Sequence, residues 1–264
     1  MEIINKLCEI DPNARIADNV EVGSFTVITG DVEIGEGTWI GPNVTIFDGA
    51  RIGKNCKIHP GAVISGVPQD LKFKGEYSTV EIGDNTTIRE CVTINRGTID
   101  REKTAVGHNS LIMAYVHLGH DCIVGNHCII SNAVQMAGHV EMDDYAILGG
   151  SCAVQQFVHI GSNTYIGGGS LVRKNVPPYV KAAREPLTYA GVNSTGLQRR
   201  GYTQEEINQI SDIYRILFVK GYNISKAIDE ISTQLPDTRF KNAILEFIQT
   251  SPSGIIREFR PIDK

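Results

Sequence analysis

The sequence has no excess of basic residues, since 25 Lys and Arg stand against 30 Asp and Glu and give a net charge of -5. Nucleic-acid-binding proteins usually carry a basic face, so nucleic acid is not an expected partner. No apolar run approaches the length of a membrane span. The first residues, MEIINKLCEIDPNARI, lack the basic and apolar regions of a signal peptide. We therefore expect a cytoplasmic protein with no membrane span.

Glycine, in contrast, is abundant: its 27 residues are dispersed rather than clustered as in a linker, which suggests internal repeats. An aliphatic residue recurs at every sixth position. The series runs from Ile4 to Ile64, resumes from Ile82 to Ile94, and continues from Val106 to Val172. Neither a helix nor a plain strand has this period. The interruptions fall in two polar stretches, which we expect to be loops at about 66–79 and 95–105.

A second series lies four residues after each aliphatic residue and is mostly small, as at Val20, Thr26 and Val32. One large and one small inward position in every six predict short strands joined by tight corners. Glycine or asparagine often follows the aliphatic residue, as in IGEGTWIGPNVT, and we expect the corner to need its permissive backbone angles there. The pattern predicts a β-helix, a solenoid whose coils bury only against their neighbours.

The cysteines follow the same small series and argue against disulfides. Free cysteine behaves as a small hydrophobe in such a position. Only Cys91 lies outside the series, and it belongs to no motif of its own. We expect buried thiols at the other five positions, which are Cys8, Cys56, Cys122, Cys128 and Cys152.

The repeat is similar to the hexapeptide repeat of the left-handed parallel β-helix superfamily. That resemblance implies the left-handed turn and a triangular coil of three hexapeptides, or eighteen residues. We expect this domain to span 1–190. In 191–264 the pattern changes: Thr203 with Glu206 predicts a capping box at the start of a helix, and Gly221 predicts its end. Two further helices are expected at about 225–235 and 237–250. The fold class is thus mainly β, with a small α-helical C-terminal domain.

All seven histidines lie outside both inward series, which weakens a core role for them. An eighteen-residue coil places His117 below Gln135, His120 below Gly138 and Gln156, and Asp121 below His139. Strands of neighbouring coils lie about 4.8 Å apart, so these side chains are expected to act on one ligand. Imidazole in general titrates near neutral pH and suits acid–base chemistry.

A metal site is the less favoured interpretation of these histidines. Proteins that resemble gamma-class carbonic anhydrase bind metal with two histidines five residues apart, whereas the spacing here is HLGH. A metal also needs at least three ligands of defined geometry, and no further histidine lies at a matching position. We expect no metal.

Several motifs occur in an order that carries a closer resemblance. They are VPQDLKFKGE, RECVTINRGT, VHLGHDCIVGN, AGHVEMDDYAILGG, NVPPYV and GVNSTGLQRRGY. Over essentially the whole chain they resemble the UDP-N-acetylglucosamine O-acyltransferase family, which catalyses the first step of lipid A biosynthesis. The resemblance implies transfer of a 3-hydroxyacyl group from the phosphopantetheine of acyl carrier protein to the sugar 3-hydroxyl, with no resident cofactor. It also implies a homotrimer with its active sites between subunits.

The resemblance assigns roles to individual residues. His120 would be the general base, Asp121 would orient it, and the backbone N–H of Gly138 would stabilise the developing oxyanion. Substrate contacts would come from Gln69, Asp70, Lys72, His117, His139 and Gln156, and nucleotide and phosphate contacts from Asn193, Arg199 and Arg200. Gly167 and Gly168 would set the acyl-chain length. The chain departs from the family at Gln155, where the family commonly has histidine.

A solenoid has flat or convex faces, and a small-molecule site needs a concavity. The missing walls must come from the polar loops, the C-terminal domain or another copy of the chain.

Three other interpretations of the function remain as alternatives. They are the N-acyltransferase of the same pathway, which has an additional N-terminal uridine-binding domain, a small-molecule acetyltransferase that uses coenzyme A, and a non-enzymatic β-helix that binds a surface or ice.

Overall fold

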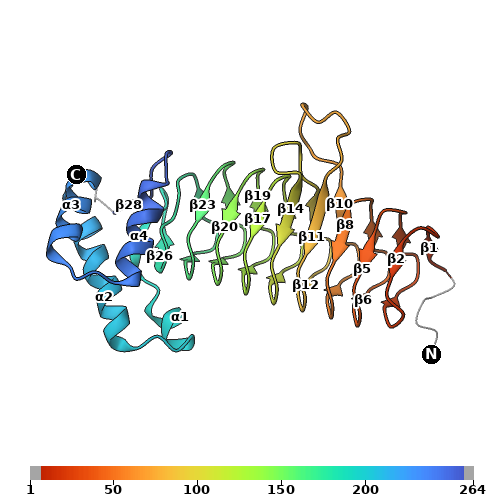
Figure 1. Ribbon diagram of the computed structural model, residues 1–264, viewed down its shortest axis with the longest axis horizontal. Helices are drawn as coiled ribbons and strands as arrows, with labels where there is room; N and C mark the ends of the chain where they lie inside the picture. The colour runs from red at the N-terminus through yellow and green to blue at the C-terminus, as the bar shows by residue number, and fades with distance from the viewer. Residues whose placement is uncertain (1–6, 259–264) are drawn as a thin grey trace.

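The computed structural model describes residues 7–258 (Figure 1). Ile4, where the expected repeat begins, lies outside the described residues, as do the outer ends of both expected domains. The chain forms a long prism of short parallel strands with a group of helices at its C-terminal end. The predicted left-handed parallel β-helix of hexapeptide repeats is confirmed.

Three sheets form the sides of the prism. Sheet 1 contains β1 (Glu9–Ile10), β4 (Val27–Ile28), β7 (Thr45–Ile46), β10 (Val63–Gly66), β13 (Thr93–Asn95), β16 (His117–Leu118), β19 (Gln135–Met136), β22 (Ala153–Val154) and β25 (Leu171–Val172). Sheet 2 contains β2 (Arg15–Ile16), β5 (Glu33–Ile34), β8 (Ala50–Ile52), β11 (Thr79–Ile82), β14 (Lys103–Val106), β17 (Ile123–Val124), β20 (Glu141–Met142) and β23 (His159–Ile160). Sheet 3 contains β3 (Glu21–Val22), β6 (Trp39–Ile40), β9 (Lys57–Ile58), β12 (Thr87–Ile88), β15 (Leu111–Ile112), β18 (Ile129–Ile130), β21 (Ile147–Leu148), β24 (Tyr165–Ile166), β26 (Val180–Ala183), β27 (Thr188–Val192) and β28 (Arg257–Glu258).

The register between coils shows where the repeat is interrupted. Glu9 pairs with Val27, an offset of eighteen residues. Val63 pairs with Thr93, thirty residues on, and Thr93 with His117, twenty-four residues on. The surplus residues form loop A (67–78) and loop B (96–102), both inserted between a strand of sheet 1 and the next strand of sheet 2. Both loops project from the same edge of the prism (Figure 1).

The core consists of the two inward series. From Val22 to Val172 the residues of the large series are buried, and the small series packs beside them. Ile10 and Ile16, in the first described coil, are only partly buried. Cys56, Cys122, Cys128 and Cys152 are buried as predicted, whereas Cys8 is only partly buried, and all six cysteines are free.

The corner does need a permissive backbone angle, at Gly37 and Asn43 in the stretch IGEGTWIGPNVT, but the glycine directly after the aliphatic residue does not supply it. The positive φ falls three positions after the aliphatic residue, at Asn43 (57°) for example. Gly23, which directly follows Val22, lacks a side chain for another reason: a Cβ there would lie 2.5 Å from the backbone nitrogen of Pro42 in the next coil. Glycine therefore permits close stacking of coils at this position, rather than an unusual backbone angle.

The end of the solenoid is closed by a β-hairpin and helices. Strands β26 and β27 pair antiparallel, and neither this hairpin nor the short helix α1 was predicted. The helices are α1 (Ser194–Arg199), α2 (Gln204–Tyr214), the π-helical turn η1 (Arg215–Val219), α3 (Ile224–Gln234) and α4 (Arg239–Gln249). The predicted capping box of Thr203 and Glu206 is present at α2. Among the described residues, no helix is long and apolar enough to cross a membrane.

Candidate active site

The predicted histidines and both loops meet at one edge of the prism, between sheet 1 and sheet 2. His117 lies in β16, and the chain turns into β17 through His120 and Asp121. Loop A and loop B leave the solenoid at the same edge in earlier coils. Inserted residues and the outward residues of the corner therefore share one region, although they lie far apart in the sequence.

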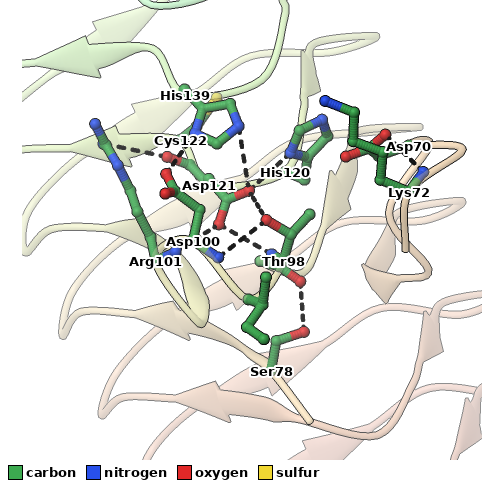
Figure 2. Close-up of polar contacts among 12 residues, drawn as sticks. Asp70, Lys72, Ser78, Thr98, Asp100, Arg101, His120, Asp121, Cys122 and His139 are labelled. Carbon is green, nitrogen blue, oxygen red and sulfur yellow. Dashed lines mark hydrogen bonds and ion pairs between the residues drawn. The ribbon is translucent and has the colours of Figure 1, made fainter. Parts of the chain in front are cut away.

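Asp121 turns this corner with a φ of 61°, in the left-handed region that aspartate tolerates better than most residues. This angle brings its carboxylate back toward the preceding side chain. His120 Nδ1 lies 2.7 Å from Asp121 Oδ2 (Figure 2). Because an ionised carboxylate only accepts hydrogen bonds, Nδ1 must donate, and in the neutral ring Nε2 is left as an acceptor. The pairing of adjacent residues required by the predicted base and orienter is thus present.

Asp121 is completely buried, which the outward position predicted from the repeat did not indicate. Loop B covers it. The backbone N–H of Thr98 donates to Oδ1 at 2.9 Å and the Thr98 hydroxyl donates to Oδ2 at 2.7 Å. The backbone N–H of Arg101 also donates to Oδ1, at 3.3 Å. Burial by itself raises the pKa of the Asp121 carboxyl, but the hydrogen bonds from His120 and Thr98 outweigh it, so the pKa is lowered below its usual 3.8.

Gly138 lies one coil above His120, as the eighteen-residue stacking predicts. A Cβ at this position would lie 2.6 Å from both Cε1 and Nε2 of the His120 ring. Carbon atoms in ordinary contact are about 3.5–4.0 Å apart. The bare backbone of Gly138 therefore leaves room for the imidazole directly against the next coil.

His139 lies beside this pair. Its Nε2 is 3.7 Å from Asp121 Oδ2, and its Nδ1 is 3.1 Å from Asp100 Oδ2, a contact that lacks hydrogen-bond geometry. The ring of Phe157 stacks on it with centroids 4.6 Å apart. These contacts hold the His139 ring at right angles to that of His120.

His117 lies on the strand below the corner. Its Nδ1 is 2.8 Å from the hydroxyl of Thr93. Burial, and secondarily the nearby His120, lowers the pKa of His117 from its usual 6.5. His117 is therefore held in its neutral form over a wider pH range than an exposed histidine.

A concavity of about 670 Å³ opens at this edge. Its wall includes eight of the predicted residues: Gln69, Asp70, Lys72, His117, His120, Gly138, His139 and Gln156. Leu71, Gly119, Ala137 and Phe157, which were not predicted, line it as well. Phe157 could have been found from the sequence, because it lies eighteen residues after His139. Leu71 is fully exposed at the mouth of the concavity.

One group of residues has the composition of a metal site. The donor atoms of His120, Asp121 and His139 all lie within 4.8 Å of one another. The oxygens of Asp121, however, already accept hydrogen bonds from Thr98, Arg101 and His120. A cation would have to displace several of these bonds. The donor set therefore fits an orienting carboxylate better than a metal ligand.

Known proteins share this architecture over its full length. A family model described as Udp N-acetylglucosamine O-acyltransferase, Domain 2, matches residues 175–256, and one described as Bacterial transferase hexapeptide matches 31–66 and 103–138. An acyl-(acyl-carrier-protein)–UDP-N-acetylglucosamine O-acyltransferase of Thiobacillus denitrificans is 44% identical over 97% of this chain and 100% of its own length. The chain belongs to the UDP-N-acetylglucosamine O-acyltransferase family. It is an acyltransferase.

Solved structures of family members agree with this assignment. A UDP-N-acetylglucosamine acyltransferase from Bacteroides fragilis is 45% identical, and the match covers 96% of this chain and 99% of that one with a TM-score of 0.94. The corresponding enzyme of Arabidopsis is 31% identical, with coverage of 97% and 100% and a TM-score of 0.85.

Not all the residues that the family resemblance assigned to the site lie at the concavity. Asn193 is buried as the N-cap of α1 and donates to the backbone oxygen of Asn163. Arg200 lies over the ring of Tyr145, 5.1 Å from its centroid, and donates to the Tyr145 backbone oxygen. Arg199, in the last turn of α1, is exposed. Within one chain of this O-acyltransferase family member, none of these three residues lines the concavity at His120.

Gly167 and Gly168 lie at another edge of the prism. They follow β24 of sheet 3 and precede β25 of sheet 1, whereas His120 lies between sheet 1 and sheet 2. A Cβ at Gly168 would lie 3.1 Å from the backbone oxygen of Gly150. The acyl-length role predicted for these glycines stays a prediction.

Proposed function

We propose that the protein transfers a 3-hydroxyacyl group from acyl carrier protein to the 3-hydroxyl of UDP-N-acetylglucosamine, with His120 as the general base. The observation that carries the proposal is the His120–Asp121 pair, joined at 2.7 Å at the wall of a concavity of about 670 Å³. Asp121 fixes the imidazole so that Nε2 is the free acceptor. A sugar hydroxyl is a weak nucleophile and needs such a base.

The proposed reaction balances without a resident cofactor or metal. Nε2 of His120 takes the proton from the sugar hydroxyl while the hydroxyl oxygen forms a bond to the thioester carbonyl carbon. The negative charge on the carbonyl oxygen would be stabilised by the backbone N–H of Gly138, beside the ring. The carbon–sulfur bond then breaks, and the imidazolium returns its proton to the phosphopantetheine thiolate.

Substrate orientation in this proposal comes from the other residues of the concavity. Lys72 and Asp70 lie on loop A, where Asp70 Oδ1 accepts a hydrogen bond from the backbone N–H of Lys72 at 2.9 Å. Together with Gln69, His117, His139 and Gln156 they supply donors and acceptors for a sugar. The proposed acceptor, a nucleotide sugar, is polar. Charged and polar groups on a loop beside a rigid strand edge, around a concavity of about 670 Å³, suit such a molecule.

The proposal includes a homotrimer with active sites between subunits. Two features support it: Gly167 and Gly168 lie at a different edge from His120, and Asn193, Arg199 and Arg200 lie at the C-terminal end of the prism. A partner subunit would bring its own copies of these edges to the concavity. Analytical ultracentrifugation across a dilution series tests this; a fully active monomer would refute it.

We also propose a cytoplasmic location, because the donor protein and the nucleotide sugar are both water-soluble.

The whole reaction is tested by incubating the protein with UDP-N-acetylglucosamine and a set of 3-hydroxyacyl carrier proteins of graded chain length. Mass spectrometry should show one acylated nucleotide sugar, with a clear preference for one chain length. Transfer from acetyl-coenzyme A but from none of the acyl carrier proteins would refute the proposed donor and favour the acetyltransferase alternative.

A further inference from the structure

Loop B is tied down over the catalytic pair by several polar contacts. The hydroxyl of Ser78 donates to the backbone oxygen of Gly97. A side chain at Gly97 would lie 2.2 Å from the backbone nitrogen of Lys103, so the two ends of the loop are in close contact. Arg101 forms an ion pair with Glu141, in the second coil above the loop, and its Nη1 donates to the Asp121 backbone oxygen at 3.3 Å. The loop therefore has a defined conformation over Asp121.

Thr98 is the residue of this loop that makes two contacts with the carboxylate. Only 6% of its surface is exposed, and its backbone N–H and hydroxyl bind the two oxygens of Asp121 separately (Figure 2). Oδ2 is thereby shared between the Thr98 hydroxyl and His120 Nδ1, each at 2.7 Å. Two donors on one carboxylate oxygen fix its direction, and that direction fixes the plane of the imidazole.

We propose that Thr98 is a positioning residue, which orients Asp121 and through it the reactive nitrogen of His120. This inference rests on the proposed function and deepens it, because it assigns a role in catalysis to a loop that touches neither reacting atom. The Thr98 backbone N–H persists in every variant except proline, so side-chain substitution tests the hydroxyl.

The test compares Thr98→Val, which removes the hydroxyl but keeps the shape, with Thr98→Ser, which keeps the hydroxyl. Thr86→Val is the matched control, because it also removes a buried threonine hydroxyl, one that donates to the Gly107 backbone oxygen at 2.7 Å. Neither Thr86 nor Gly107 lines the concavity. Thr98→Val should lower kcat about 10- to 100-fold, while the KM values stay within about threefold, because a displaced base slows the chemical step. Thr98→Ser should recover most of kcat, and Thr86→Val should keep it.

A purely structural role for Thr98 would not shift the pH dependence of the reaction. With one donor removed, the Asp121–His120 pair binds a proton more readily, so the acidic limb of the kcat/KM profile should move to higher pH in Thr98→Val alone. The other ionisable groups around the pair are His117, His139, Asp100, Arg101 and Cys122, and all of them are present in each variant. Equal pH profiles and equal kcat for Thr98→Val and wild type would overturn the proposal.

Nitrogen-15 NMR of the His120 ring separates this result from failure of the proposed function. Wild type should show one Nδ1–H signal in a hydrogen bond to Asp121, and in Thr98→Val that signal should be shifted and broadened, because the carboxylate that accepts it is no longer fixed. This readout needs no substrate, so it holds even if the protein transfers no acyl group. An unchanged position and width of the Nδ1–H signal in Thr98→Val would refute the positioning role, whereas absent transfer by wild type would refute only the proposed reaction.

Discussion

The contact between Gly138 and the His120 ring gives the sharpest quantitative prediction. In Gly138→Ala the added Cβ would lie 2.6 Å from Cε1 and Nε2, so the ring must retreat by about 1 Å to reach an ordinary contact of about 3.5–4.0 Å. The 2.7 Å bond to Asp121 would then lengthen beyond the range of a normal hydrogen bond. A displacement of this size costs roughly 100-fold in rate, or about 2.7 kcal/mol of transition-state stabilisation.

Stability should change much less than activity in this variant. The φ of Gly138 is not in the left-handed region, and the ring can move into the adjoining concavity. We therefore expect a loss in the free energy of unfolding of about 1 kcal/mol, at the lower end of the range for an added methyl group. Initial rates by mass spectrometry give kcat, and urea unfolding gives stability.

The matched control is Gly30→Ala, at the same position of the repeat and the same edge of the prism. A Cβ there would meet only the end of the Asp11 side chain, at 3.2 Å, so kcat should be unchanged. A kcat of Gly138→Ala within twofold of wild type would refute the packing argument.

Three further predictions concern Asp121, Arg199 and Gly168. The pKa of the Asp121 carboxyl is lowered in the folded protein, so its stabilising effect is present above its unfolded pKa and is lost as pH falls through the folded value. In urea unfolding, wild type should therefore have a larger free energy of unfolding than Asp121→Asn at pH 7, and this difference should shrink below about pH 3.8. A difference that stays constant with pH would contradict a stabilising role of the ionised Asp121 carboxylate. Arg199→Ala should raise the KM for the UDP-sugar about 10-fold or more and leave that for the acyl donor nearly unchanged, as for loss of a charged hydrogen bond; the reverse pattern would move the nucleotide site elsewhere. Gly168→Met should shorten the preferred acyl chain in the graded series, and an unchanged preference would remove Gly168 from the acyl groove.

The fold was predictable because the repeat is a direct physical constraint. A side chain at every sixth position must face the interior of the prism, so the aliphatic series from Val22 to Val172 reports the coils themselves. Breaks in the same series marked loop A and loop B. The stacking of Gly138 over His120 also followed from the coil length, since neighbouring coils keep a constant register.

The surroundings of Asp121 were not predictable in this way. Thr98 lies in loop B, where the register is lost, so no periodic argument could place it against the carboxylate. The repeat gave only the outward direction of Asp121 and not the loop that buries it. The short helix α1 was missed because a six-residue helix shows too little apolar periodicity to be detected. The β26–β27 hairpin lies beyond Val172, where the six-residue repeat ends, so the repeat carried no information about it. Asn193 and Arg200 came from motif resemblance alone, and one chain does not bring them to the concavity.

The acyl-transfer rate of His120→Asn tests the central claim most directly. The asparagine amide can replace the Nδ1–H donor to Asp121, so the buried carboxylate keeps a partner, but the variant has no group that can take the proton. We expect a loss of about 100- to 10,000-fold in kcat, with the melting temperature and oligomeric state of wild type retained. Turnover within tenfold of wild type in the folded variant would contradict general-base catalysis by His120.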